Sequence, residues 1–137
     1  MSKVVASSGG FDPLHKGHIE HLKEAKKLGD KLVVILNKDQ FLLKKKGSVF
    51  IPYEDRREIL KSLGFVDDVI PCIDDDETVC KTLIQLKPDI FAKGGDWDNK
   101  KIPEIKDCEK LGIKVVRSVG EKKDSKPLMA SKERINE

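Results

Sequence analysis

The chain has 137 residues, of which 37% are charged and 38% are apolar, and its formal net charge is +3. This length and composition predict one globular domain and exclude a chain that is disordered throughout. No apolar run approaches the roughly 18 residues of a membrane-spanning helix. The first residues also lack the apolar stretch of a signal peptide, and the charges of both signs do not form the dense basic stripe of a nucleic-acid binder.

The three cysteines are Cys72, Cys80 and Cys108. Their number is odd and their spacing includes no C-x-x-C pair, so neither a zinc site nor a secreted disulfide framework is indicated. We therefore expect a cytoplasmic protein whose ligands are small, anionic molecules.

Short apolar runs without alternation, rich in β-branched residues, are typical of parallel strands covered on both faces. The predicted strands are Lys3–Ala6, Leu32–Leu36, Asp68–Ile70, Ile90–Ala92 and Lys114–Arg117. Amphipathic segments predict helices from His18 to Leu28, from Pro52 to Leu63, from Thr78 to Leu86 and from Ile105 to Leu111, with Gly29, Gly64 and Gly112 at their C-terminal ends. We interpret part of Lys38–Val49, which is basic and polar, as a mobile loop over the sheet.

This order of elements predicts one α/β domain over residues 1–137, a Rossmann-like, doubly wound parallel sheet of five strands. Residues 121–137 are charged, and we expect this tail to be partly mobile. In such sheets ligands bind outside the carboxyl ends of the strands, near a switch in strand order. The loops that follow the strands are therefore the place to look for a site.

The loop after the first strand reads Gly9-Gly10-Phe11-Asp12-Pro13-Leu14-His15-Lys16-Gly17-His18 and leads into a helix. Glycines let backbone N–H groups approach a phosphate, a helix N-terminus favours negative charge, and both histidines can donate hydrogen bonds to phosphate oxygens. The residues favour a phosphate-binding turn over a structural one, although either histidine alone is more often an N-cap or a surface residue. The two commonest nucleotide-binding loops, G-x-x-x-x-G-K-[ST] and G-x-G-x-x-G, are absent.

This loop closely resembles the H-x-G-H signature of the cytidylyltransferase-like nucleotidyltransferase superfamily, in the form G-x-F-D-x-x-H-x-G-H. The resemblance covers about residues 3–120. Lys44 and Lys46 fall where glycerol-3-phosphate cytidylyltransferases carry phosphate-binding lysines. Lys93-Gly94-Gly95-Asp96-Trp97 is similar to a segment of those enzymes and of heptose-phosphate adenylyltransferases.

The resemblance implies in-line attack by a substrate phosphate on the α-phosphorus of a nucleoside triphosphate, which expels pyrophosphate without a covalent enzyme intermediate. The expected reaction is transfer of CMP to a polyol or sugar phosphate. Transfer of AMP to a heptose phosphate or to FMN is the alternative, and a nucleotide-binding module without turnover is the alternative from another class. The resemblance also implies Mg²⁺ bound through the nucleotide phosphates, and a homodimer.

The resemblance assigns roles to individual residues. The expected catalytic residues are His15, His18 and Lys46, and the expected ligands of the acceptor phosphate are Lys44 and Arg56. The expected nucleotide-binding residues are Gly9, Gly10, Phe11, Asp12, Gly17, Lys93, Gly95, Asp96, Trp97, Arg117, Gly120 and Ser125.

Without the resemblance, several of these residues have plainer explanations. The lysines fit a solvated basic loop. Asp96 and Trp97 fit a turn aspartate and a half-buried core tryptophan, and Arg56 fits a surface arginine that pairs with a nearby carboxylate.

The sequence departs from the family after the last predicted strand. The family usually has R-T-x-G-[IVC]-S-[TS]-[TS], whereas this chain has Arg117-Ser118-Val119-Gly120 and then charged residues. Ser125, or less readily Ser131, would then replace the missing hydroxyls. The acidic run Asp74–Glu77 suits the start of a helix better than a metal site, so we predict no residue as a metal ligand.

Overall fold

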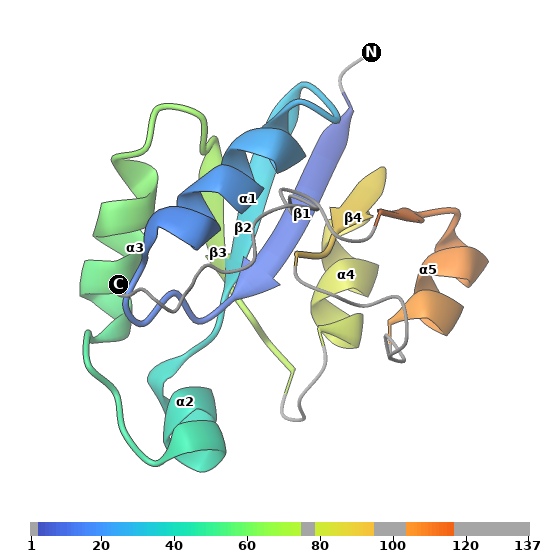
Figure 1. Ribbon diagram of the computed structural model, residues 1–137. Helices are drawn as coiled ribbons and strands as arrows, with labels where there is room; N and C mark the ends of the chain where they lie inside the picture. Colours follow the sequence, from blue (N-terminus) through green and yellow to red (C-terminus); the bar gives the residue numbers. More distant parts are fainter. Residues whose placement is uncertain (1–2, 75–78, 95–103, 117–137) are drawn as a thin grey trace.

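Five parallel strands form the centre of the structure, a computed structural model that describes residues 3–74, 79–94 and 104–116 (Figure 1). The strands are β1 (Val4–Gly9), β2 (Lys31–Leu36), β3 (Asp68–Pro71), β4 (Ile90–Ala92) and β5 (Lys114–Val116), in the spatial order β3-β2-β1-β4-β5. The helices are α1 (Lys16–Lys26), α2 (Asp39–Lys46), α3 (Tyr53–Lys61), α4 (Cys80–Leu86) and α5 (Ile105–Leu111). The predicted Rossmann-like α/β fold is confirmed.

The strand order reverses between β1 and β4, and this switch fixes the position of the site. Val5 of β1 pairs with Leu32 of β2 on one side and with Ile90 of β4 on the other. From β1 the chain first builds the sheet outward through β2 and β3 and then returns to add β4 and β5. The loops that leave β1 and β4 therefore diverge and open a crevice at their carboxyl ends.

Side chains alternate along the strands between two separate cores. Val5 belongs to a cluster that also contains Leu22 of α1 and Leu60 of α3. Ala6 belongs to a cluster on the other face, which includes Leu83 of α4 and Cys108 of α5. Helices α1 and α3 thus cover one face of the sheet, and α4 and α5 cover the other, whereas α2 lies beyond the carboxyl ends of the strands (Figure 1).

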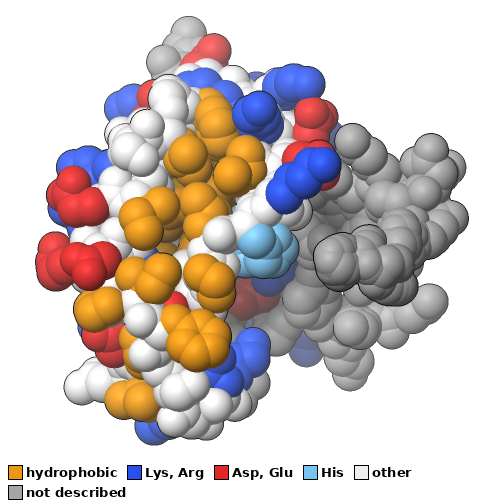
Figure 2. All heavy atoms as spheres, turned by 60° about the vertical axis from the view of Figure 1, so that its left-hand side comes forward, with side chains coloured by type: hydrophobic (Ala, Val, Ile, Leu, Met, Phe, Trp, Pro, Cys, Tyr) orange, Lys and Arg blue, Asp and Glu red, His pale blue; other side chains and the backbone are white. Residues whose placement is uncertain are grey.

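The α1 and α3 side of the molecule keeps apolar side chains in contact with solvent. Figure 2 shows such side chains gathered on this side, with a histidine at the margin of the group. Phe50 is 71% exposed and Ile59 is 40% exposed, while Leu14, Leu63 and Phe65 pack only partly buried against the core.

The predicted end of β1 and both predicted ends of α1 are wrong. β1 continues to Gly9 instead of ending at Ala6, because its backbone pairs with the whole of β2 as far as Gly9 and Leu36. α1 starts at Lys16 and ends at Lys26, so Gly29 is not its C-cap. Gly29 lies instead at a close contact, where a Cβ atom would stand 2.8 Å from Cγ2 of Val5.

The segment Lys38–Val49, part of which we expected to be a loop, contains helix α2. Leu42 is buried and anchors the helix. A Cβ atom on Gly10 would lie 2.9 Å from a methyl group of Leu42, so α2 packs directly on the loop after β1. Gly47 has φ +80° and ends the helix in the left-handed conformation that glycine adopts without strain. A single buried apolar position gave too weak a periodicity to predict this helix.

The remaining boundaries differ by a few residues. α3 starts after Pro52 and ends at Lys61, with Ser62 as the C-cap instead of Gly64. α4 starts at Cys80, and Thr78 and Arg117 lie outside the described residues. α5 and its cap at Gly112 are as predicted. Among the residues that the structure describes, no helix is long and apolar enough to cross a membrane.

The buried guanidinium of Arg56 joins three loops at the carboxyl edge of the sheet. Its side chain is completely buried. Its Nε donates to the carbonyl oxygen of Ile51 at 2.8 Å, and its NH1 donates to the carbonyl oxygens of Gly10 and Asn37, both at 2.8 Å. NH2 donates to Oδ1 of Asp39 at 2.7 Å. The loops after β1, after β2 and before α3 are therefore held to one another by a single side chain.

Asp12 forms a second link between the same loops. Its side chain is 1% exposed and accepts the backbone N–H groups of Phe50 and Ile51 at 2.8 and 2.7 Å. The ammonium of Lys46 lies 3.0 Å from the same carboxylate. Burial alone would raise the pKa of this carboxyl, but the hydrogen bonds from Phe50, Lys46 and Ile51 outweigh burial and lower its pKa. The carboxylate therefore stays ionised and keeps the loops joined.

We predict that Arg56→Met strongly destabilises the fold. The substitution keeps the length of the side chain but leaves the carbonyl oxygens of Gly10, Asn37 and Ile51 without their donor, and loss of such buried, charge-assisted hydrogen bonds costs about 3 kcal/mol. The free energy of unfolding in urea measures this cost. The matched control is Arg57→Met, one residue along, because Arg57 makes only a 3.9 Å surface ion pair with Glu58 and its loss costs about 0.5 kcal/mol or less. Equal effects of the two substitutions would contradict the role of Arg56.

Candidate active site

The N-terminus of α1 is capped by the two histidines of the H-x-G-H segment. His15 is the N-cap, and its Nδ1 accepts the backbone N–H of Gly17 at 3.1 Å. His18 completes a capping box, because its Nδ1 accepts the backbone N–H of His15 at 3.2 Å. Histidine therefore fills positions that Ser, Thr or Asp and Glu or Gln usually fill. The same bonds that start the helix fix the positions of both rings.

These hydrogen bonds also fix where each neutral ring carries its proton. Because Nδ1 of His15 and of His18 both accept backbone N–H groups, the neutral tautomer of each has its proton on Nε2. The rings are stacked, with centroids 3.7 Å apart and an interplanar angle of 25°. Two N–H donors are thus presented side by side at a helix N-terminus.

Glycines in this segment provide space for aromatic rings. A Cβ atom on Gly17 would lie 3.1 Å from Cε1 of His15, and a Cβ atom on Gly9 would lie 3.0 Å from the ring of Phe11. Phe11 is buried, has φ 50° and contacts His18 edge-on, with ring centroids 5.0 Å apart. Bulky residues rarely adopt the left-handed region, and such strain is typical of functional loops.

A cavity of about 380 Å³ opens at the switch between β1 and β4. The residues that line it are Ser8, Gly9, Gly10, Phe11, His15, Gly17, His18, His21, Lys93 and Gly94. The structure thus brings together seven of the residues that the sequence assigned to nucleotide binding and catalysis. No Asp or Glu stands among the described residues that line the cavity, and the first turn of α1 has no acidic residue. The helix dipole is therefore unopposed there and favours an anion.

The environment of the cavity disfavours protonation of His18. Burial, together with repulsion from His15 and His21, lowers the pKa of His18 to about 4. Burial also lowers the pKa of Lys93, against the opposing effect of the Glu104 carboxylate. The negative charge of a bound polyanion would stabilise the protonated forms of His18 and Lys93.

Three other predicted site residues, Asp12, Lys46 and Arg56, lie outside this cavity lining. Lys46 donates to the carbonyl oxygen of Asp12 at 2.9 Å and pairs with its carboxylate. The carboxylate of Asp12 is buried against the backbone N–H groups of Phe50 and Ile51. The guanidinium of Arg56 is buried among the loop carbonyl oxygens that it binds. These contacts give Asp12 and Arg56 structural roles, so we do not retain them as ligands of nucleotide or acceptor phosphate. Gly95, Asp96, Trp97, Arg117, Gly120, Ser125 and Ser131 lie outside the described residues.

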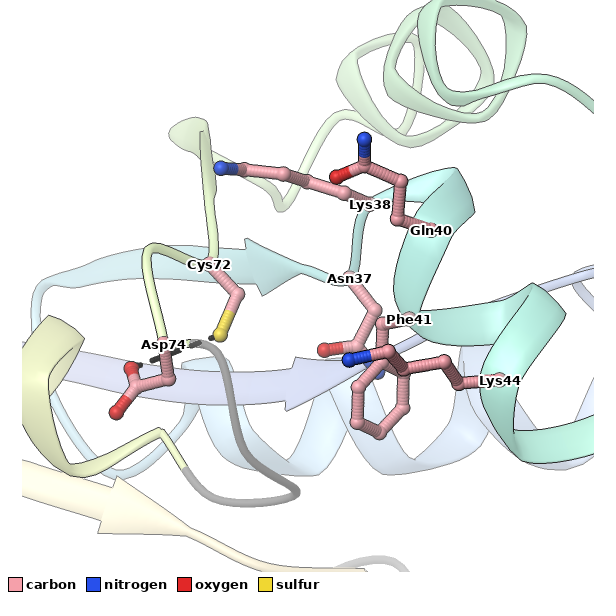
Figure 3. A pocket seen from close by; sticks show the side chains of 7 residues that line it. All are labelled: Asn37, Lys38, Gln40, Phe41, Lys44, Cys72 and Asp74. Carbon is pink, nitrogen blue, oxygen red and sulfur yellow. Dashed lines mark hydrogen bonds between the residues drawn. The ribbon is translucent and has the colours of Figure 1, made fainter.

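Lys44 lines a second, smaller pocket of about 80 Å³ at the carboxyl ends of β2 and β3. Figure 3 shows Asn37, Phe41 and Lys44 on one side of this pocket and Cys72 and Asp74 facing them from the other. Lys38 and Gln40 complete the lining. The pocket lies beside the histidine cavity, because the backbone N–H of Asn37 donates to the carbonyl oxygen of Gly9 at 3.0 Å.

Sequence reasoning missed His21 and Ser7. Nε2 of His21 lies 2.6 Å from Oγ of Ser7, and His21 lines the main cavity. The signal for His21 was available, since it follows His18 by the same three residues that separate His18 from His15 and so shares a helix face. Ser7 gave no signal, because its partner is distant in sequence.

No metal site is seen in the described part of the chain. Over residues 3–74, 79–94 and 104–116, no group of three or more His, Cys, Asp or Glu side chains is arranged to hold a metal ion. Cys72 and Cys108 are buried, and burial raises the pKa of each thiol, that of Cys108 to about 11. Such thiols are poor nucleophiles.

Comparison with known proteins shows the family to which this chain is related. A family model described as cytidylyltransferase-like matches residues 7–137. The chain is 41% identical over 102 residues to the bifunctional protein HldE of Campylobacter concisus, and the aligned region covers 73% of this chain and 21% of that protein. It is 43% identical over 118 residues to the FAD synthase of Pyrococcus horikoshii, and here the aligned region covers 85% of this chain and 73% of that protein.

A solved structure agrees with these matches. The crystal structure of the lipopolysaccharide core biosynthesis protein from Thermoplasma volcanium superposes with a TM-score of 0.72 at 36% identity, over 85% of this chain and 96% of that one. The fold therefore agrees with the family match. The chain belongs to the cytidylyltransferase-like family, and it spans about a fifth of the length of HldE.

We predict that stability depends on the titration of His18 between pH 6.5 and about 4. In this range the unfolded chain binds a proton at this histidine and the folded chain does not. The contribution of His18 to the free energy of unfolding is therefore complete above pH 6.5 and is lost as the pH is lowered towards 4. His18→Gln should remove this component while keeping the capping box, since Gln suits that helix position. The difference between the two unfolding curves against pH measures the effect. An NMR titration that places the His18 midpoint near 6.5 would contradict it.

Proposed function

We propose that this protein is a nucleotidyltransferase that joins a nucleoside monophosphate to a phosphate monoester and releases pyrophosphate. The observation that supports it best is the pair of Nε2–H donors of His15 and His18, fixed by the capping box at the mouth of the β1–β4 cavity. In the reaction, an acceptor phosphate oxygen attacks the α-phosphorus of the donor. A new bond forms between this oxygen and the α-phosphorus. The bond from the α-phosphorus to the oxygen that bridges it to the β-phosphorus breaks, and pyrophosphate leaves with that oxygen.

The donor would lie in the 380 Å³ cavity. His15 and His18 would donate to the α- and β-phosphate oxygens, and Lys93 would add a positive charge opposite them. Such fixed donors stabilise the charge that develops in the transition state without reorganising. Mg²⁺ would be held by the triphosphate itself, because the described residues of the cavity offer no carboxylate, and it would neutralise charge on the phosphates.

The acceptor would approach from the α2 side. Lys44 lines the second pocket, and Lys46, two residues later on the same helix, pairs with Asp12 of the histidine loop. Lysine side chains are long and flexible, so an incoming phosphate can draw either ammonium from its present position. The pocket at Asn37 and Cys72 would then receive the part of the acceptor beyond its phosphate.

For the donor we favour ATP over CTP, a change from the choice that the sequence suggested. FAD is FMN with an adenylyl group on its phosphate, so the similarity to an FAD synthase supports adenylyl transfer to a phosphate monoester. The family's description as cytidylyltransferase-like supports CTP as the second candidate. We also propose that the protein is cytoplasmic. We propose further that it forms a homodimer, in which the apolar side chains seen in Figure 2 would form the contact surface.

The first test of this function is a thermal-shift and turnover experiment. We expect ATP with Mg²⁺ to raise the melting temperature, because a ligand at a hundredfold excess over its Kd stabilises the folded state by about 2.7 kcal/mol. Pyrophosphate release is then measured with FMN, a sugar phosphate and glycerol 3-phosphate as acceptors. A shift with CTP alone would reverse the choice of donor. Binding without pyrophosphate release from any acceptor would instead indicate a nucleotide-binding module.

We predict that His15→Asn and His18→Gln each lower kcat by about 10²–10³-fold, the usual effect of losing one transition-state donor. Asn is a good N-cap and Gln completes a capping box, so both variants keep the helix start and lose only the imidazole N–H. Steady-state kinetics and the melting temperature are measured together. Full activity in either variant would remove that histidine from the mechanism, and a collapse of stability would show that capping was its main role.

A further inference from the structure

His21 of α1 forms a partly buried polar pair that neither capping nor the proposed chemistry uses. Nε2 of His21 lies 2.6 Å from Oγ of Ser7, and Ser7 is completely buried in β1. The neighbours of Ser7 in the sheet are apolar, since it pairs with Val34 of β2. The hydroxyl of Ser7 is therefore buried in the sheet, and the half-buried ring of His21 lies between it and the cavity that this ring lines.

Stability alone gives little reason for this pair. A buried hydroxyl or imidazole is tolerated only when it is hydrogen-bonded, and replacing both partners with apolar groups of similar shape is often neutral or stabilising. Valine stands at position 5, two residues before Ser7 on the same face of β1, and it packs in one apolar cluster with Leu22 of α1. The sequence keeps a polar pair where an apolar pair would pack, which points to a role in the site.

The imidazole of His21 lies against the loop that leaves β4. A Cβ atom on Gly94 would stand 2.9 Å from Nδ1 and 3.3 Å from Cγ and Cε1 of His21, so the backbone at Gly94 packs on the ring. The preceding residue, Lys93, is tied to β5, because its backbone N–H donates to the carbonyl oxygen of Val116 at 2.8 Å. His21 therefore sets the separation between α1 and the β4 loop, which is the width of the cavity.

We propose that Ser7 and His21 act as a positioning pair for the donor nucleotide. Ser7 holds the imidazole, the imidazole holds Gly94, and the distance from the His15 and His18 donors to Lys93 is thereby fixed to suit the triphosphate. This inference rests on the proposed function. It assigns to His21 an effect on donor affinity, with the reacting groups themselves left in place.

The test is the double variant Ser7→Ala/His21→Leu, with ATP and CTP as the probes. We expect a melting temperature close to that of the wild type, a Kd for the preferred nucleotide raised about tenfold or more, and kcat at saturating donor changed much less. Misplacing a binding group by about 1 Å can reduce a rate by about 10²-fold, so a tenfold loss of affinity is a modest expectation. Unchanged donor affinity in a stable double variant would overturn the proposal.

Gly94→Ala provides a second test that leaves Ser7 and His21 intact. The added methyl group must displace either the β4 loop or the imidazole of His21, so donor affinity should again fall. Gly64→Ala is the matched control, because nothing lies within 4 Å of a Cβ atom there, and it should bind the donor as the wild type does. A Gly94→Ala protein with wild-type affinity would contradict the positioning role. If the wild type itself binds no nucleoside triphosphate, the proposed function fails and this inference fails with it.

Discussion

The Arg56 guanidinium is the interaction on which the rest of the site depends. A parallel sheet brings the carboxyl ends of its strands to one edge, but it does not fix the loops that follow them. Arg56 does so by donating to carbonyl oxygens in the loops after β1 and β2 and in the entry to α3. Its planar guanidinium carries five N–H donors in a fixed arrangement, so it can bind backbone oxygens in several directions at once. Burial makes these bonds strong, and it also makes the position intolerant of substitution.

The histidine loop combines folding and function in the same atoms. Nδ1 of each ring caps the helix, which leaves Nε2 to face a ligand. The spacing of three residues that suits a capping box also places the two rings in a stack, and the intervening glycine leaves room for the first ring. The H-x-G-H pattern is thus a structural requirement and a chemical one. This explains why a short segment is so informative about both.

Much of this could be predicted from the sequence, because the signals were local. The unbroken apolar runs gave the parallel sheet, and the loop from Gly9 to His18 gave the site. Helix α2 was missed because Leu42 alone is buried on it, and β1 was predicted too short because its last residues are ordered by pairing with β2. The roles of Arg56 and Asp12 could not be predicted at all. Except for Ile51, the hydrogen-bond partners of both side chains lie more than fifteen residues away, and only the folded chain brings them close.

The two pockets differ in the groups that would attract an anion. In the cavity at β1 and β4, the donors are imidazoles and a helix N-terminus, fixed in place by the capping hydrogen bonds, together with the half-buried ammonium of Lys93. In the second pocket, the positive charges are the ammonium groups of Lys38 and Lys44, and Asp74 lines the same pocket. Rigid donors suit a triphosphate that must be held in one orientation. Flexible cations suit a substrate and a product that must enter and leave. The difference follows from where each residue lies, since α1 packs on the sheet and α2 lies beyond its edge.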